Sequence, residues 1–180
     1  MREIYVDIAK AAIEDVLYDR NTIDREKLLE TAPELAQYGA TFVTLTLHGA
    51  LRGCIGSLVA HRPLIDDLID NARAAAFRDP RFYPLTISEF DEVETEISLL
   101  SEPKLLAYDS VADLKEKVRP GIDGVVLNLN EQRATFLPQV WDELPTFELF
   151  FSHLCHKAGL GADCLEEHPK IELYQVEKVK

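Results

Sequence analysis

A change in the spacing of apolar residues near Thr41 is the feature that most restricts the fold of this chain. Before it, apolar residues recur at every fourth position, which predicts an amphipathic helix over residues 3–19 and a shorter helix over 24–32. From Thr41 to Leu47, apolar residues alternate with polar ones, as is typical of a half-buried strand. The chain therefore combines helices with strands.

The turn signals that follow give the order of the remaining elements. His48-Gly49 predicts a turn into a return strand over 50–59, and Pro63 can open a helix that Asp79-Pro80 ends. Further on we expect a helical turn at Thr86, a strand over 93–99, a helix over 110–118, strands at 122–129 and 133–137, a loop exposing Gln139, Val140 and Trp141, a helix from Thr146 to Gly159, and a strand over 171–179. This order predicts an α+β fold with a mostly antiparallel sheet flanked by helices.

Length and charge narrow the class of protein. A chain of 180 residues with 47% hydrophobic content can form one globular domain with a core of its own. The formal net charge of −13 opposes binding to a phosphate backbone, so nucleic acid is not an expected partner. No segment resembles a membrane span, and acids interrupt the N-terminus where a signal peptide would be apolar, so we expect a cytoplasmic protein.

The hexapeptide Leu51-Arg52-Gly53-Cys54-Ile55-Gly56 places a thiol, a guanidinium group and two glycines together. In an extended strand, Arg52 and Cys54 would project to one side, where the fixed cation favours a thiolate. The glycines would leave the backbone bare for the close approach of a ligand or another chain. Cys54 is thus a candidate nucleophile or ligand contact, and the alternative is a small buried hydrophobe.

The other cysteines and the histidines gather near the C-terminus. Three cysteines are too few and too unevenly spaced for a disulfide framework, so we expect all three to be reduced. The potential metal ligands in this region are His153, Cys155, His156, Cys164 and His168. Helical geometry brings no compact set of four together, so no metal is expected. His153 can act as a titrating group or as an ordinary helix-surface residue.

Two further positions carry polar side chains in structured segments. Glu96 lies in a strand pattern and is either a general acid or base, or a solvent-facing residue. Asp79 and Arg81 are expected to pair or cap locally at a helix end. No phosphate loop, dinucleotide fingerprint, nucleophile elbow or zinc-protease motif is present in the sequence, which removes several common enzyme classes.

The hexapeptide is similar to the signature of the AMMECR domain family, and further blocks agree in order over nearly the whole chain. These blocks include Asn71-Ala72-Arg73-Ala74-Ala75-Ala76-Phe77, Asp79-Pro80-Arg81-Phe82, Glu96-Ile97-Ser98-Leu99-Leu100, Ala134-Thr135-Phe136-Leu137-Pro138-Gln139-Val140-Trp141 and His153-Leu154-Cys155-His156-Lys157-Ala158-Gly159-Leu160. Similar bacterial proteins are called AmmeMemoRadiSam system protein A, because they occur beside a MEMO-type protein and a radical S-adenosylmethionine enzyme.

The resemblance implies a single α+β domain, residues 1–180, with two lobes and the hexapeptide lining a cleft between them. It places Arg52, Cys54, Asn71, Glu96, Gln139 and His153 in that cleft, and it supplies no established reaction. Residues after Gly161 lack the tryptophan expected in related bacterial sequences, so no role is transferred beyond Leu160.

Two functions are consistent with these residues. The first is a cysteine-dependent enzyme acting on a small or peptide-like substrate, with Cys54 as nucleophile, Arg52 stabilising the thiolate and orienting an anionic group, and Glu96 or His153 moving protons. Asn71 and Gln139 would bind substrate, and no cofactor is expected. The second is a non-catalytic accessory module that uses the same cleft alongside the MEMO-type and radical S-adenosylmethionine proteins.

Overall fold

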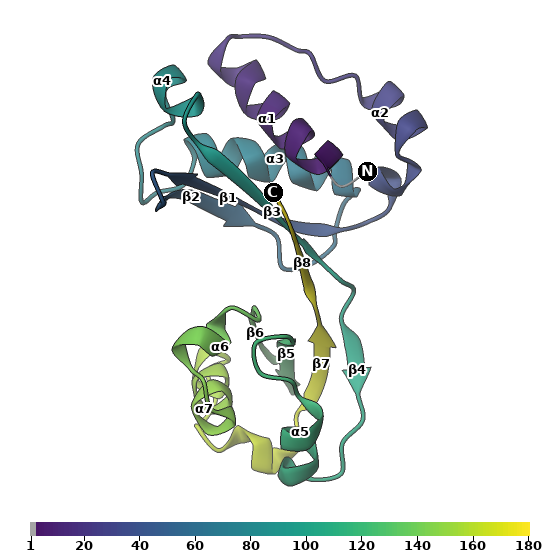
Figure 1. The fold of residues 1–180 in the computed structure, drawn as a ribbon. Coiled ribbons are helices and arrows are strands. Elements are labelled where there is room, and N and C mark those ends of the chain that lie inside the picture. The colour runs from purple at the N-terminus through teal and green to yellow at the C-terminus, as the bar shows by residue number, and fades with distance from the viewer. Residues whose placement is uncertain (1–2) are drawn as a thin grey trace. The chain divides into compact units, whose positions relative to one another are not determined.

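The computed structural model describes residues 3–180 and divides the chain into two compact units (Figure 1). The first unit comprises the described residues up to Leu100 together with Glu177–Lys180, and the second comprises Ser101–Val176. Each unit contains its own sheet and its own hydrophobic core. The predicted α+β class is confirmed, with two sheets where one was expected.

The first unit is a four-stranded sheet covered by helices. Its elements are α1 (Glu3–Leu17), α2 (Arg25–Thr31), the 3-10 helix η1 (Pro33–Ala36), β1 (Ala40–Leu47), β2 (Ala50–Gly56), α3 (Leu64–Phe77), α4 (Ile87–Phe90), β3 (Glu94–Leu100) and β8 (Val176–Val179). The strand order is β2-β1-β3-β8, and both pairings of β1 are antiparallel. β2 therefore lies at an edge of the sheet.

Local signals explain why these elements begin and end where they do. Asp24 caps α2 by accepting from the Lys27 N–H, and Thr86 and Glu89 form the reciprocal capping box of α4. The hairpin between β1 and β2 turns at His48 and Gly49, which both adopt positive φ. The predicted helices and strands of this unit are thus confirmed, with β2 ending three residues earlier than expected.

A buried carboxylate joins α3 to the sheet. Asp67 is fully buried and accepts hydrogen bonds from the Thr41 N–H and hydroxyl, each at 2.8 Å, and from the Ser57 hydroxyl at 2.6 Å. Arg62 pairs with the same carboxylate at 2.9 Å, and the Asn71 amide donates to it at 2.9 Å. Because Asp67 of α3 binds both the N–H and the hydroxyl of Thr41 in β1, this network sets the position of α3 along β1.

The glycines of the hexapeptide are explained by packing within the unit. A Cβ atom on Gly53 would lie 2.1 Å from the Ala75 carbonyl oxygen of α3, and one on Gly56 would lie 2.2 Å from the Phe42 ring. The predicted close approach is therefore made by α3 and by Phe42 of the neighbouring strand. The backbone at these two positions is covered, and the reading of it as bare surface for a ligand is wrong.

The second unit is a sheet packed against helix α7. Its elements are β4 (Lys104–Leu106), α5 (Val111–Lys117), β5 (Gly124–Leu129), β6 (Gln132–Phe136), α6 (Val140–Glu143), α7 (Phe147–Lys157), the 3-10 helix η2 (Cys164–Glu167) and β7 (Lys170–Tyr174). The strand order is β4-β7-β5-β6, with antiparallel pairing throughout. The single predicted strand over 171–179 is two strands, β7 and β8, which belong to different sheets.

Aromatic residues fill the core of the second unit and correct one expectation. Trp141 was expected in an exposed loop, yet it is 3% exposed and lies in α6. Its ring stacks on Phe150 with centroids 3.7 Å apart, and its indole N–H donates to the Asp123 carbonyl at 2.9 Å. The flanking prolines indicate a loop, but they carry no information about tertiary packing. The burial of the large Trp141 side chain in the core holds this segment against the rest of the unit.

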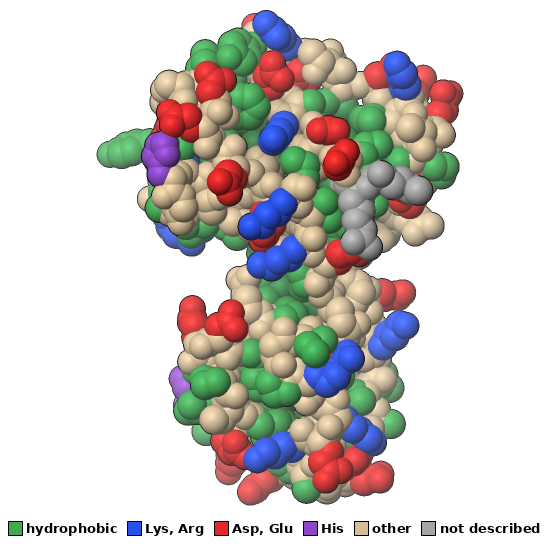
Figure 2. All heavy atoms as spheres, viewed as in Figure 1, with side chains coloured by type: hydrophobic (Ala, Val, Ile, Leu, Met, Phe, Trp, Pro, Cys, Tyr) green, Lys and Arg blue, Asp and Glu red, His purple; other side chains and the backbone are tan. Residues whose placement is uncertain are grey.

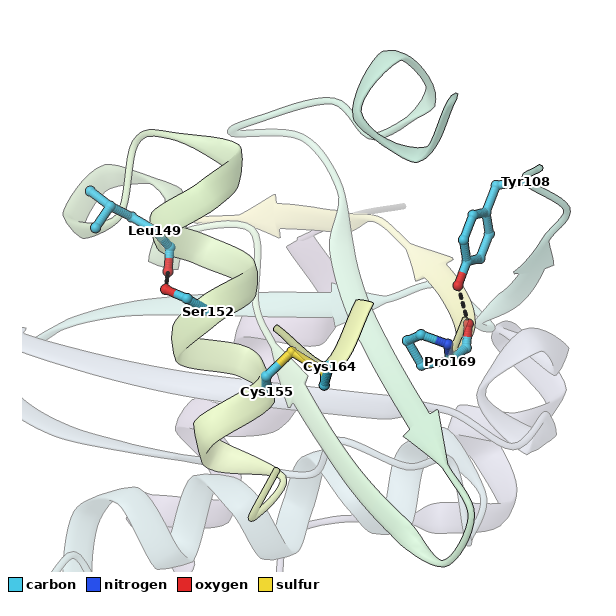
Figure 3. Close-up of a disulfide and its surroundings, with 6 residues drawn as sticks. All are labelled: Tyr108, Leu149, Ser152, Cys155, Cys164 and Pro169. Atoms are coloured by element: carbon cyan, nitrogen blue, oxygen red, sulfur yellow. Dashed lines mark hydrogen bonds between the residues drawn. A yellow bond between two sulfur atoms is a disulfide. The ribbon is translucent and has the colours of Figure 1, made fainter. Parts of the chain in front are cut away.

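A disulfide joins Cys155 of α7 to Cys164 of η2, with the two sulfur atoms shown in Figure 3. Both cysteines are buried, at 0% and 1% exposure. The expectation that all three cysteines are reduced is therefore wrong for this pair, while Cys54 has a free thiol. Sequence spacing cannot report that the chain folds back after Gly159 and brings the two side chains together.

Within the described residues, no helix is long and apolar enough to cross a membrane.

Replacing Gly53 by alanine tests the close approach of α3 to β2. The added Cβ would collide with the Ala75 carbonyl, so we expect the free energy of unfolding to fall by about 3 kcal/mol in urea titrations. Gly49→Ala is the matched control, because nothing lies within 4 Å of its Cβ position and its cost is limited to positive φ. Equal losses in the two variants would contradict the packing explanation.

The disulfide predicts how many cysteine side chains react with a thiol reagent before and after reduction. In urea without reductant, a thiol-specific dye should label one cysteine, Cys54, and after reduction it should label all 3 cysteines of the chain. We expect the double variant Cys155→Ala/Cys164→Ala to lower the free energy of unfolding of the second unit by about 2–3 kcal/mol, because the closed loop restricts the unfolded chain. A reductant should then have no further effect on this variant.

Candidate functional site around Cys54

Cys54 lies on the sheet face opposite α3 and has a partly exposed side chain. It is paired in register with Thr44 of β1, and Thr44 is paired with Glu96 of β3. The Cys54 Sγ and the Thr44 Oγ1 are 3.4 Å apart, within hydrogen-bonding distance for sulfur. A row of three polar side chains, Cys54, Thr44 and Glu96, thus crosses three strands on one face.

The backbone of Cys54 is held by an Asp79–Arg81 pair, which we call the edge clamp. The Asp79 carboxylate accepts from the Cys54 N–H at 2.9 Å, and the Arg81 guanidinium donates to the Cys54 carbonyl at 3.3 Å. Two further bonds, at 3.0 and 2.7 Å, join the two side chains to each other. The clamp occupies the hydrogen-bonding positions that another strand would use at this edge.

The clamp also explains the contact between the Cys54 thiol and Thr44. Both backbone polar groups of Cys54 point outward to the clamp, so Cys54 and Thr44 form a non-hydrogen-bonded pair within the antiparallel ladder. Cross-strand side chains approach more closely in such pairs. Local pairing of Asp79 with Arg81 was expected from the sequence and is confirmed, but its attachment to Cys54 was not foreseen.

Arg52 occupies a different environment from the one predicted. Leu45 pairs with Gly53 and Thr46 with Leu51, so Arg52 is the extra residue of a β-bulge. Its guanidinium makes two bonds to Glu89, at 2.9 and 3.0 Å, and a third to the Tyr83 carbonyl at 2.9 Å. Among the described residues no hydrogen bond joins it to the Cys54 thiol, and the guanidinium that contacts Cys54 is that of Arg81. The catalytic role of Arg52 stays a prediction.

The two carboxylates that bind these guanidinium groups are held in the ionised form. Hydrogen bonding to Arg52, with a smaller contribution from Thr86, lowers the pKa of Glu89 from 4.5 to about 2. Hydrogen bonding to Arg81, aided by the Cys54 N–H, lowers the pKa of Asp79 well below its usual range, and the Asp79 bond raises the pKa of Arg81. Each arginine is therefore neutralised by its own carboxylate.

Glu96 and Asn71 belong to the same unit as Cys54 but have different surroundings. The Glu96 side chain is 18% exposed and pairs with Lys178 at 3.1 Å and Lys180 at 3.3 Å. Asn71 is 3% exposed, and its amide is bound within the network around Asp67 and Thr41. This geometry gives Asn71 a structural role, and its contact with a substrate stays a prediction.

His153 and Gln139 lie in the second unit. His153 is exposed on α7, where its Nδ1 lies 2.8 Å from the Leu149 carbonyl oxygen. Gln139 is exposed at the residue before α6 and its side chain makes no capping hydrogen bond. The proximity of these two side chains to Cys54, and the cleft between lobes, stay predictions from the resemblance.

The described residues contain no group of three or more histidine, cysteine, aspartate or glutamate side chains arranged to hold a metal ion. In the C-terminal cluster, the sulfur atoms of Cys155 and Cys164 are bonded to each other. Acidic and basic side chains are interspersed on the displayed face of each unit (Figure 2).

Together these features define an α+β protein with a free thiol fixed on an edge strand. Comparison with known proteins identifies the family, because the AMMECR1 family profile matches residues 6–179. A protein from Methanothermobacter thermautotrophicus is 38% identical over 94% of this chain and 88% of its own. A protein from Thermococcus onnurineus is 36% identical, with coverage of 97% and 87%.

A solved structure agrees with the sequence comparison. The crystal structure of the uncharacterized protein PH0010 from Pyrococcus horikoshii superposes with a TM-score of 0.78 at 34% identity, covering 98% of this chain and 89% of that one. The chain belongs to the AMMECR1 family, and the resemblance drawn from the hexapeptide is confirmed.

The lowered pKa of Glu89 predicts a pH dependence of stability. A depressed pKa in the folded state contributes stability above the ordinary value of 4.5, and this contribution is lost as the pH falls toward about 2. Glu89→Gln should therefore flatten the decline of the urea midpoint in this window. Glu30→Gln, at an exposed position of α2, should retain the wild-type slope. Parallel slopes in wild type and Glu89→Gln would contradict the assignment.

Proposed function

We propose that this AMMECR1-family protein is a cysteine-dependent enzyme that uses the Cys54 thiol on a small or peptide-like substrate. The observation that carries the proposal is the edge clamp, which fixes both backbone polar groups of a free, partly exposed cysteine. A reacting group is most effective when its position is fixed before the substrate arrives.

The proposed reaction is acyl transfer to sulfur. The Cys54 Sγ forms a bond to the acyl carbon, the bond to the leaving amine or alcohol breaks, and the leaving group takes up the proton that the thiol loses. Water then attacks the thioester, which releases a carboxylic acid and restores the thiol. The Thr44 hydroxyl, 3.4 Å from Sγ, can donate a hydrogen bond to the sulfur while it is anionic.

The other predicted residues keep in the proposal the roles expected from the sequence. Glu96 lies in the same cross-strand row and is the proposed proton carrier of the first unit. His153 is the alternative carrier, with Gln139 and Asn71 as proposed substrate contacts and Arg52 as the proposed anion contact. Asp79 and Arg81 act as positioning residues, because they touch the backbone of Cys54 and leave its thiol free.

A second candidate function is an accessory binding module for MEMO-type and radical S-adenosylmethionine proteins. One observation favours it: the hydrogen-bond partner of the Cys54 thiol within the described residues is a hydroxyl, and no hydrogen bond joins the thiol to a histidine or carboxylate there. A non-catalytic thiol needs no base. The two candidates differ in whether the reaction requires the sulfur atom.

Acylation of Cys54 by a p-nitrophenyl ester tests the enzyme proposal. We expect native protein to be acylated at least about tenfold faster than urea-unfolded protein, because the fold positions the thiol. Asp79→Asn should lose this native enhancement while its unfolded chain reacts at the wild-type rate. Mass spectrometry of the modified peptide and release of nitrophenolate provide the two readouts.

Cys54→Ser and Glu30→Gln are the controls for this experiment. Cys54→Ser should show no thioester, and Glu30→Gln should behave as wild type. A thiol that reacts only after unfolding would overturn the enzyme proposal. Full activity of Cys54→Ser in an assay reconstituted with the MEMO-type and radical S-adenosylmethionine proteins would favour the accessory module.

A further inference from the structure

A cavity of about 370 Å³ lies in the first unit beside β3. It falls in the size range of small-molecule sites, about 300–1,000 Å³. Thr44 lines it together with two lysines, two glutamates and an apolar wall that includes Val93. Cys54 is not among the lining residues, and Thr44, whose hydroxyl lies 3.4 Å from the Cys54 Sγ, is the residue that links the cavity to the proposed reacting atom.

Charged side chains of both signs line the cavity. Glu96 is already paired with Lys178 and Lys180. Lys10 of α1 and Glu94 of β3 line the same cavity, and neither side chain has an ion-pair or hydrogen-bond partner among residues 3–180. One ammonium and one carboxylate group are thus available for a ligand.

A buried polar group adds an independent observation. Thr95 lines the cavity, is 6% exposed, and its Oγ1 has no hydrogen-bond partner within the described part of the chain. An unpaired buried hydroxyl is unfavourable, because it has lost its hydrogen bonds to water. If the Thr95 side chain rotates toward the cavity, a polar ligand group or a water that the ligand holds in place can satisfy this hydroxyl.

We infer that the cavity binds a zwitterion with the chemistry of a free amino acid or a short peptide. The ligand ammonium group would pair with Glu94 and its carboxylate with Lys10. A ligand with only negative charge would face two glutamates, and one with only positive charge would face two lysines. The presence of both signs therefore favours a molecule that carries both charges.

This inference deepens the proposed function, on which it rests for the reaction that the bound molecule undergoes. Binding itself needs no chemistry at sulfur. It can therefore be measured in Cys54→Ser, so that a failure of the enzyme proposal and a failure of the zwitterion site give different results.

The test is a titration of the full chain and of Cys54→Ser with glycine, alanine and glycylglycine, followed by NMR chemical shifts. We expect saturable shifts centred on the amides of β3 and of α1 near Lys10. N-acetylglycine and glycinamide, which each lack one charge of glycine, should bind at least about tenfold more weakly. Glu94→Gln and Lys10→Gln should weaken glycine binding to a similar degree.

Matched controls separate the site from general charge effects. Glu30→Gln and Lys27→Gln remove the same charges elsewhere in the first unit and should retain wild-type affinity. The zwitterion site is overturned if no probe gives saturable shifts, if the acetylated and amidated analogues bind as well as glycine, or if Glu94→Gln and Lys10→Gln bind like the controls.

Discussion

The pairing of Asp79 with Arg81 at the open edge of the first sheet is the constraint on which the candidate site depends. An edge strand leaves backbone donors and acceptors exposed. Here one carboxylate and one guanidinium take the Cys54 N–H and carbonyl, so β2 is held at the residue that carries the free thiol. The same bonds make Cys54 and Thr44 a close cross-strand pair. Side chains of a single loop thus set both the backbone and the thiol environment.

The position of this edge depends in turn on the packing of α3. Gly53 allows the Ala75 carbonyl to approach β2, and the buried Asp67 carboxylate bonds to β1 at Thr41. The loop that carries Asp79 and Arg81 follows directly from the C-terminal end of α3. Consequently α3 packs against one face of the sheet, and the loop at its C-terminal end places the edge clamp beside β2. The hexapeptide glycines serve this arrangement, and the thiol lies on the opposite face.

Most elements could be predicted from the sequence because their signals are local. The period change near Thr41, the capping box of Thr86 and the turn at His48 each act within a few residues. Contacts between distant residues carried no such signal: the disulfide of Cys155, the burial of Trp141 and the partner of Arg52 depend on tertiary packing. The hexapeptide predicts Cys54 as the centre of the candidate site. The bonds from Asp79 and Arg81 to its backbone depend on the tertiary fold and have no signal in the sequence. A bulge at Arg52 was enough to break the alternation that had paired it with the thiol.

The arginine side chains near the candidate site are neutralised by carboxylates, although the protein as a whole carries a large negative charge. The chain carries a formal net charge of −13, yet Arg52 is matched by Glu89 and Arg81 by Asp79. The net negative charge of the chain does not attract an anion over a distance, and the guanidinium groups of Arg52 and Arg81 are each already bound to a carboxylate. The recognition that we propose therefore relies on short-range contacts, made by hydroxyl groups and by the unpaired side chains of Lys10 and Glu94 in the cavity lined by Thr44. Such contacts discriminate by the placement of opposite charges within one small molecule, because a ligand that lacks one of the two charges loses the ion pair that this charge would form.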